Sequence, residues 1–303
     1  MQLDLFEDNR PAILLNIADE FIRSRDLSQA VSVFEQLLDE YPNDRYCAPL
    51  LKEVSEWQDT LTVINTSDPE CFRDIWLRFG SITHSPLRSM VLSLLIDWIG
   101  GLPHPERIYF PPDYHFGHVL LAAGRYDETA DCFFAALSDA NIPRGKFMAW
   151  HADALTLANK EADALKSYLN AFLDDPSTVD VQFIKNSAIR NLYNSLCLEA
   201  VEELEEYGEL AWMPVWGWFE ALFALPAPQA ITGTGSFDSF DFDRLIAENE
   251  RPVPRIWFDM LTYAERLRVT ARDSRELAAV RRLMKKTGSF MFETYLNKIR
   301  GTR

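Results

Sequence analysis

The sequence contains little glycine, and its few cysteines are not paired. Only 12 of the 303 residues are glycine, which argues against a turn-rich all-β fold. The four cysteines, Cys47, Cys71, Cys132 and Cys197, lie far apart, and no CxxC occurs. We therefore expect free, buried thiols in a reducing compartment.

Long apolar runs are also missing. The most apolar window, LAWMPVWGWFEALFAL, begins at Leu210, ends at Leu225 and contains Pro214 and Glu220. Because it is too short to span a bilayer, we interpret it as a buried helix. Acidic residues near the N-terminus stand where a signal peptide would have basic ones. These features predict a cytoplasmic protein without membrane association.

Sequence motifs for chemistry are absent as well. The chain has no GxxxxGK[ST], GxSxG, HExxH or GxGxxG. His115 and His118 are three residues apart on an expected helix and, with His151 and Asp153, suggest a metal site. However, His151 falls at a helix-packing position, and no closely spaced third ligand follows. We predict a non-catalytic protein with no metal and no cofactor.

Positive charge is scarce except near the C-terminus. The formal net charge is −16, which makes binding of nucleic acid by the whole surface improbable. From Arg251 onward, 13 Lys and Arg face 5 Asp and Glu, so this stretch carries +8. The basic region between Arg266 and Lys286 is the one candidate for phosphate contacts. Solvated helix faces, or docking on the acidic body, are the favoured interpretation of its cations, which are Arg266, Arg268, Arg272, Arg275, Arg281, Arg282, Lys285 and Lys286.

Apolar residues recur at every third or fourth position almost throughout, which predicts an all-α protein. The helices expected outside the repeats described next cover residues 46–57, 69–79, 86–99, 181–198, 214–225, 255–268 and 274–285. Residues 226–239 are rich in Pro, Gly, Ser and Thr and are predicted to link a domain at 1–225 to a basic helical region at 240–303.

Two segments 35 residues apart share a pattern of small and large side chains. Gly117 and Ala152 take one small position, Thr129 and Ala164 a second, and Phe133 and Tyr168 an aromatic one. The first helices of the chain fit the same frame, with Ala18, Ala30 and Phe34 in these places. Small side chains let two helices approach closely, and the aromatic ring fills the space toward the next pair.

This pattern resembles the tetratricopeptide repeat, whose unit is a pair of antiparallel helices of about 34 residues. The resemblance covers units near residues 11–43, 110–143 and 145–177. It implies a right-handed helical-repeat solenoid, with additional irregular helices, that acts as a scaffold or adaptor for another protein. The other predicted helices do not match the repeat.

The resemblance also implies a concave groove, lined by the first helix of each unit, that accepts a peptide or a partner helix. The positions that would line it are mostly neutral, so a clamp for a partner's carboxylates is not supported. An apolar or basic partner segment suits the acidic body better. Covering of these positions by other helices of the chain is the alternative. The positions are Leu15, Asp19 and Ile22, then Tyr114, His118 and Leu121, then Lys146, Ala149, Asp153 and Thr156.

The chain starts with a second short motif. Gln2, Leu3, Asp4, Leu5 and Phe6 closely resemble the peptide by which bacterial DNA polymerases and repair proteins dock on the sliding clamp. That resemblance implies a DNA replication or repair accessory protein. A lid of Leu5 and Phe6, folded back on the first helix pair, is the favoured structural alternative. A helical enzyme with a site in the C-terminal region is a further hypothesis, without a motif to support it.

Overall fold

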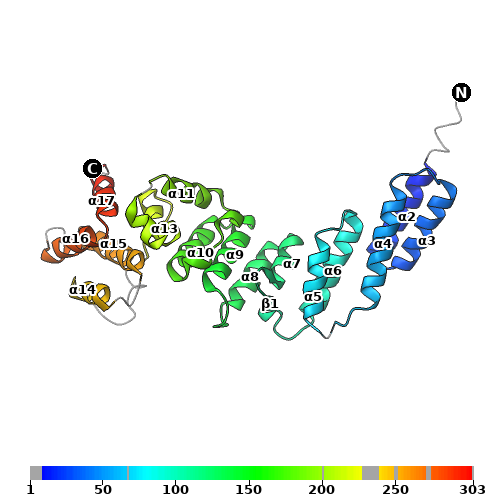
Figure 1. Ribbon diagram of the computed structural model, residues 1–303, viewed down its shortest axis with the longest axis horizontal. Coiled ribbons are helices and arrows are strands. Elements are labelled where there is room, and N and C mark those ends of the chain that lie inside the picture. Colours follow the sequence, from blue (N-terminus) through cyan, green and yellow to red (C-terminus); the bar gives the residue numbers. More distant parts are fainter. Residues whose placement is uncertain are drawn as a thin grey trace, which may run out of the picture. The chain divides into compact units, whose positions relative to one another are not determined.

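The computed structural model describes residues 9–66, 68–199, 201–226, 239–248, 252–270 and 274–301 (Figure 1). Within these ranges the protein is almost entirely helical, so the predicted all-α class is confirmed. The chain divides into two compact units, Met1–Cys132 and Phe133–Arg303. Most of the predicted linker at 226–239 lies outside the described residues, so a domain boundary there stays a prediction.

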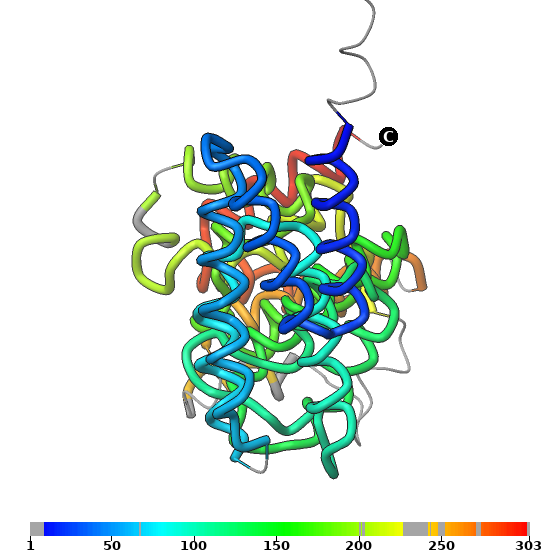
Figure 2. Tube along the Cα trace, turned by 90° about the vertical axis from the view of Figure 1, so that its right-hand side faces the viewer, coloured from blue at the N-terminus to red at the C-terminus, as the bar shows by residue number. Residues whose placement is uncertain are grey.

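Unit 1 begins with three helices that lie alongside one another (Figures 1 and 2). The second of them packs against the first and the third, and a later helix, α6, also packs against the first. Apolar residues of the first helix recur at Leu14, Ala18 and Ile22 and are buried, as expected for one face of a helix. The helices are α2 (Arg10–Arg23), α3 (Leu27–Glu40), α4 (Cys47–Thr62), α5 (Glu70–Phe79) and α6 (Ser85–Gly100).

A short hairpin follows in unit 1. A 3₁₀ turn, η1 (Pro105–Arg107), leads into two antiparallel strands, β1 (Tyr109–Phe110) and β2 (Tyr114–His115), and then into α7 (Phe116–Ala122). The prediction that places Tyr114 on a helix is therefore wrong. Pro111 and Pro112 have no N–H to donate, which disfavours a helix there. The helix begins only at Phe116, where His115 Nδ1 accepts a hydrogen bond from Gly117 N at 3.0 Å and caps it.

Unit 2 is built from helix pairs and shorter turns, and one helix, α8 (Tyr126–Ala136), spans the division between the units. In unit 2, α9 packs closely on α10, and α15 packs on α13, α14 and α16. Its elements are α9 (Arg144–Leu157), α10 (Glu161–Asp174), η2 (Pro176–Thr178), η3 (Val181–Phe183), α11 (Ser187–Cys197), α12 (Glu202–Tyr207), α13 (Glu209–Phe219), α14 (Ser239–Glu248), α15 (Val253–Thr270), α16 (Arg275–Thr287) and α17 (Ser289–Gly301).

The three predicted helix pairs are joined by the same turn. Two residues after the first helix ends, the backbone is left-handed, with φ of 68° at Arg25, 73° at Gly124 and 59° at Asn159. The next N–H then donates to a carbonyl five residues back, at 2.9 to 3.0 Å: Asp26 to Phe21, Arg125 to Leu120 and Lys160 to Leu155. This is the Schellman end of a helix, and it reverses the chain for the second helix.

The small residues of the repeat pattern are buried, as predicted. Ala18, Ala152, Ala30, Thr129 and Ala164 have no exposed surface. Gly117 is buried, and so are the aromatic residues Phe34, Phe133 and Tyr168. Close packing is thus confirmed for the pairs α2–α3 and α9–α10, whereas a solenoid that joins the three pairs stays a prediction.

Two other predictions need correction. The helix expected at 214–225 runs from Glu209 to Phe219 with Pro214 inside it, because about one turn of apolar residues, Leu210 to Met213, already precedes the proline. Trp212 and Trp216 in this helix are buried, which confirms it as core. All four cysteines are free, but only Cys47 is buried: Cys71 and Cys132 are half-buried, and Cys197 is exposed because it lies at the C-terminal end of α11.

Candidate functional site: an interaction surface

None of the ten predicted groove side chains is fully exposed. Ile22, Tyr114, Ala149 and Asp153 are buried, and the other six, Leu15, Asp19, His118, Leu121, Lys146 and Thr156, are half-buried. The structure therefore brings the first-helix positions into contact with other parts of their own units.

In unit 1, α6 covers the predicted face of α2. Asp19 accepts a hydrogen bond from Nε2 of His84, just before α6, at 2.8 Å. Arg25, in the turn after α2, pairs with Asp97 and also donates to Ser93 Oγ at 2.8 Å, both on α6. Leu15 packs against the core of the unit. These contacts hold two helices together, and they leave little of this face for a partner.

In unit 2, Asp153 of α9 is part of a buried network. It accepts hydrogen bonds from the Tyr168 hydroxyl on α10 and from the backbone N–H of Lys185 at 2.7 Å. Burial raises the pKa of Asp153 to about 6, although both hydrogen bonds act in the opposite direction. The carboxylate thus joins α9, α10 and the segment before α11.

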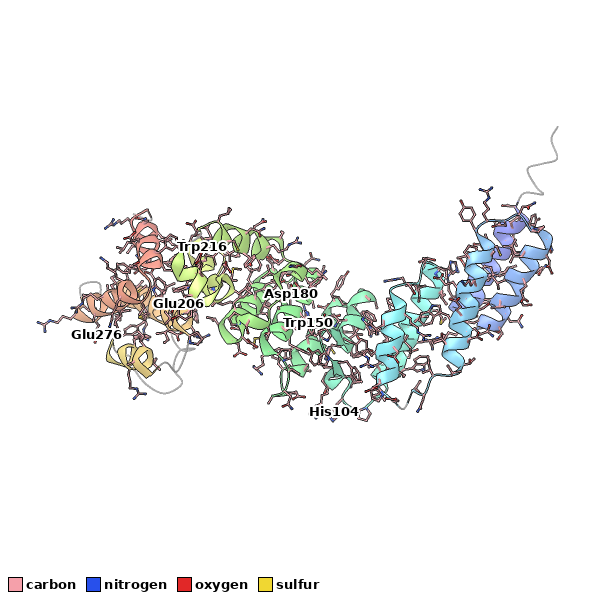
Figure 3. All side chains as sticks on the ribbon, viewed as in Figure 1. His104, Trp150, Asp180, Glu206, Trp216 and Glu276 are labelled. Carbon is pink, nitrogen blue, oxygen red and sulfur yellow. The ribbon has the colours of Figure 1, made fainter. Side chains whose placement is uncertain are left out.

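Two other predicted groove residues of α9 make local contacts. The backbone N–H of Lys146 donates to Thr178 Oγ1 at 3.1 Å, and the Lys146 ammonium lies 5.3 Å from the centre of the Trp150 ring, which Figure 3 labels. The Thr156 hydroxyl donates to the carbonyl of Ala152 at 2.9 Å. Both side chains are half-buried within unit 2.

His115, one of the two histidines considered as metal ligands, has a structural role. This side chain has no exposed surface, and its two ring nitrogens face Gly117 N and, at 2.8 Å, the carbonyl oxygen of Glu106. Burial lowers the pKa of His115 to about 4, so the ring is neutral at pH 7, with Nε2 donating and Nδ1 accepting. Since both nitrogens are engaged, His115 is not placed to bind a metal.

An open apolar cavity lies in unit 1, at the end of the bundle where α2 turns into α3. Its volume is about 490 Å³. Its apolar walls are Leu27, Leu61, Met90 and Leu94, from α3, α4 and α6. Its rim is polar and includes Gln58, which donates to Ser28 Oγ at 2.9 Å, Thr62 and the turn residues Arg25 and Asp26. We call this the Leu27–Leu94 pocket.

The Leu27–Leu94 pocket was not predicted from the sequence. Leu27 comes directly after Asp26, whose carboxylate accepts from Gln29 N at 3.1 Å and caps α3. A leucine at the first position of a capped helix gives no separate signal of an open surface. The cavity arises because α4 ends beside this turn and the middle of α6 passes beside it, although the three segments are far apart in sequence.

Among the described residues of the C-terminal region, Glu265 on α15 has a buried carboxylate. It accepts three hydrogen bonds from Arg268, at 3.1, 3.0 and 2.8 Å, and one from the Tyr295 hydroxyl at 2.9 Å. Burial raises the pKa of Tyr295 to about 12, so its hydroxyl stays protonated and donates. Glu265 is thus a fully used acceptor that joins α15 to α17.

No protein-family model, curated protein or solved structure matches the chain. Among the described residues, no helix combines the length and the apolar character needed to cross a membrane. The predicted docking motif, Gln2 to Phe6, lies outside the described residues. Function therefore has to be inferred from the chemistry of the surfaces above.

Proposed function

We propose that this protein is a non-catalytic, cytoplasmic adaptor of the tetratricopeptide-repeat type, which holds a peptide or helix of another protein. The observation that carries the proposal is the threefold recurrence of one helix-pair turn, with small side chains buried at matched positions. Such pairs recur in proteins that stack them to make binding surfaces.

The partner site we favour is the Leu27–Leu94 pocket, because α6 covers most of the predicted face of α2. Its apolar walls suit one or two large apolar side chains of a partner helix or peptide, and its polar rim suits hydrogen bonds to the partner's flanks. Unit 1 carries 10 Lys and Arg against 22 Asp and Glu, a balance of −12. A partner segment with basic flanks would complement this charge.

A charge placed in the pocket tests the site. Leu94→Glu puts a carboxylate on its wall, where a partner's apolar anchor would otherwise lie. Proximity labelling in the source cell, followed by mass spectrometry, should recover partners with the wild type and lose them with Leu94→Glu. Removal of one apolar anchor weakens such interfaces by about 2 kcal/mol, roughly thirtyfold.

Leu77→Glu is the matched control, because Leu77 is 72% exposed on α5 of the same unit and does not line the pocket. This variant should recover the same partners as the wild type. Equal recovery by both variants would move the binding site away from the pocket. Equal melting temperatures would show that loss of partners by Leu94→Glu is not loss of fold.

A second candidate function is docking on the bacterial sliding clamp, favoured by the match of all five residues from Gln2 to Phe6 to that motif. Leu5→Ala combined with Phe6→Ala should abolish co-purification with the clamp and leave the melting temperature unchanged. A lower melting temperature would instead support the folded-back lid. No observation favours the enzyme hypothesis, and Glu265 is committed to Arg268 and Tyr295.

A further inference from the structure

One face of α16 presents a row of cations. Arg275, Arg282, Lys285 and Lys286 are all exposed. In a helix with 3.6 residues per turn, Arg275, Arg282 and Lys286 fall within a narrow stripe about 16 Å long, with Lys285 beside it. Long side chains extend outward from α16 near the labelled Glu276 (Figure 3). We call these four residues the α16 stripe.

Within the part of the chain that the structure describes, the stripe makes no ion pair, although Arg282 Nε donates to the carbonyl of Ala278 on its own helix at 3.4 Å. Among the described residues, no carboxylate lies within ion-pair distance of its four cations, whereas Arg255 and Arg268 on α15 are paired with Asp259 and Glu265. From Arg275 to Gly301, seven Lys and Arg face two Glu, while the whole chain carries −16. Docking of the C-terminal cations on the acidic body, one of the sequence-based interpretations, stays a prediction.

Helix stability explains only part of the stripe. Lys285 and Lys286 lie in the last turn of α16, where a cation is favourable beside the helix C-terminus. Arg275 is the first residue of the helix, where the same dipole disfavours a cation, and Arg282 lies in its interior. Stabilisation of α16 therefore does not explain why all four cations of the stripe are present.

The rest of the α16 surface argues against two kinds of partner, a membrane and another protein. Leu277, Val280, Leu283 and Met284 are buried in unit 2, so the helix has no free apolar face to insert into a membrane. Its exposed positions hold, besides the stripe, only Glu276 and Ala278. A protein interface needs an apolar core with few lysines, and α16 offers none.

We propose that the α16 stripe binds the phosphate backbone of a nucleic acid without reading its sequence. Arg and Lys are the side chains that contact phosphates, and such binding requires no apolar anchor. Ala278, beside the stripe, lets a backbone approach the helix closely. This inference is independent of the Leu27–Leu94 pocket, because the two surfaces belong to different units.

The test measures binding of the full-length protein to a short fluorescein-labelled DNA duplex, and to one of its single strands, by fluorescence anisotropy at several salt concentrations. Four phosphate contacts with the duplex predict a slope of about −3.6 for log affinity against log salt, or about a 150-fold loss between 50 and 200 mM. Arg282→Gln with Lys285→Gln and Lys286→Gln should reduce the slope to about −0.9, or about a threefold loss.

A second triple variant, Arg23→Gln with Lys52→Gln and Lys166→Gln, removes the same charge from exposed cations elsewhere. It should bind both DNA probes like the wild type. If both triple variants lose affinity equally, net charge is responsible and the proposal fails. It also fails if the wild type binds neither probe, or binds poly-glutamate as tightly as DNA, which would assign the stripe to an acidic protein.

Discussion

Among the described residues, several buried polar side chains have a fixed hydrogen-bond partner, and the Tyr114 hydroxyl is one of the exceptions. His115, Asp153 and Glu265 hold neighbouring elements together through hydrogen bonds. The Tyr114 hydroxyl is buried beside Trp76 and Phe110, and no hydrogen-bond partner for it is present among the described residues. An unpaired buried hydroxyl costs free energy, so Tyr114 is a weak point of unit 1.

Tyr114→Phe tests this interpretation at the scale of one residue. The change removes only the hydroxyl and keeps the ring, so the free energy of unfolding should rise by about 1 kcal/mol. Urea denaturation at pH 7 measures it. A fall of similar size would show that the hydroxyl has a partner and would renew interest in Tyr114 as a binding residue.

At the scale of elements, the first helices of the three pairs differ in length but end in the same turn. α2, α7 and α9 differ from 7 to 14 residues in length, yet all end in the same turn. The same hydrogen bonds follow α13, where Ala221 has φ of 57° and Leu222 N donates to the Gly217 carbonyl at 2.8 Å. Only the glycine at position 124 occupies this conformation without strain.

Exchanging glycine and alanine at two of these turns should have opposite effects. Ala221→Gly relieves a left-handed alanine and should stabilise the protein by about 1 kcal/mol. Gly124→Ala introduces that strain, with no neighbouring atom within 4 Å to add a clash, and should destabilise it by about the same amount. Chemical denaturation of both variants measures the pair, and effects of equal sign would contradict the turn.

At the scale of the whole molecule, each unit contains a buried titratable group, and the two groups make stability depend on pH in opposite directions. The neutral form of His115 is favoured in folded unit 1, because its pKa is lowered to about 4 from 6.5. The protonated form of Asp153 is favoured in folded unit 2, because its pKa is raised to about 6 from 3.8. Acidification between pH 7 and 4 should therefore act on them in opposite directions.

The sign follows from the proton balance of folded and unfolded chains. Stability from His115 is present above pH 6.5 and is lost as the pH falls to 4, because only the unfolded chain gains the proton. Stability from Asp153 is present below pH 3.8 and is lost as the pH rises to 6, because only the unfolded chain releases the proton. Each effect amounts to about 3 kcal/mol.

His115→Asn and Asp153→Asn isolate the two effects. As the pH falls from 7 to 4, the stability of the wild type relative to His115→Asn should decrease, and relative to Asp153→Asn it should increase. Urea denaturation of the three proteins at four pH values measures both differences. Parallel curves for the wild type and either variant would show that the pKa of that group is not shifted by folding.

Several features could be predicted from local patterns, and the interaction surface could not. The periodic apolar positions predict the helices, and the recurrent Ala18, Gly117 and Ala152 predict close helix pairs. The repeat pattern predicts a helix that already includes Tyr114, but Pro111 and Pro112 delay the start of α7 to Phe116. The Leu27–Leu94 pocket was missed because three segments, far apart in sequence, form it.

By itself, the sequence determined the helical class of this protein and the small residues inside its helix pairs. These depend on contacts and backbone preferences within a few residues, which a linear pattern records. Only the tertiary structure decided that α6 covers the face of α2, that Asp153 meets Lys185, and that no described carboxylate forms an ion pair with the α16 stripe. Those outcomes depend on which distant elements meet, because burial and ion pairing are properties of the packed chain rather than of any one segment.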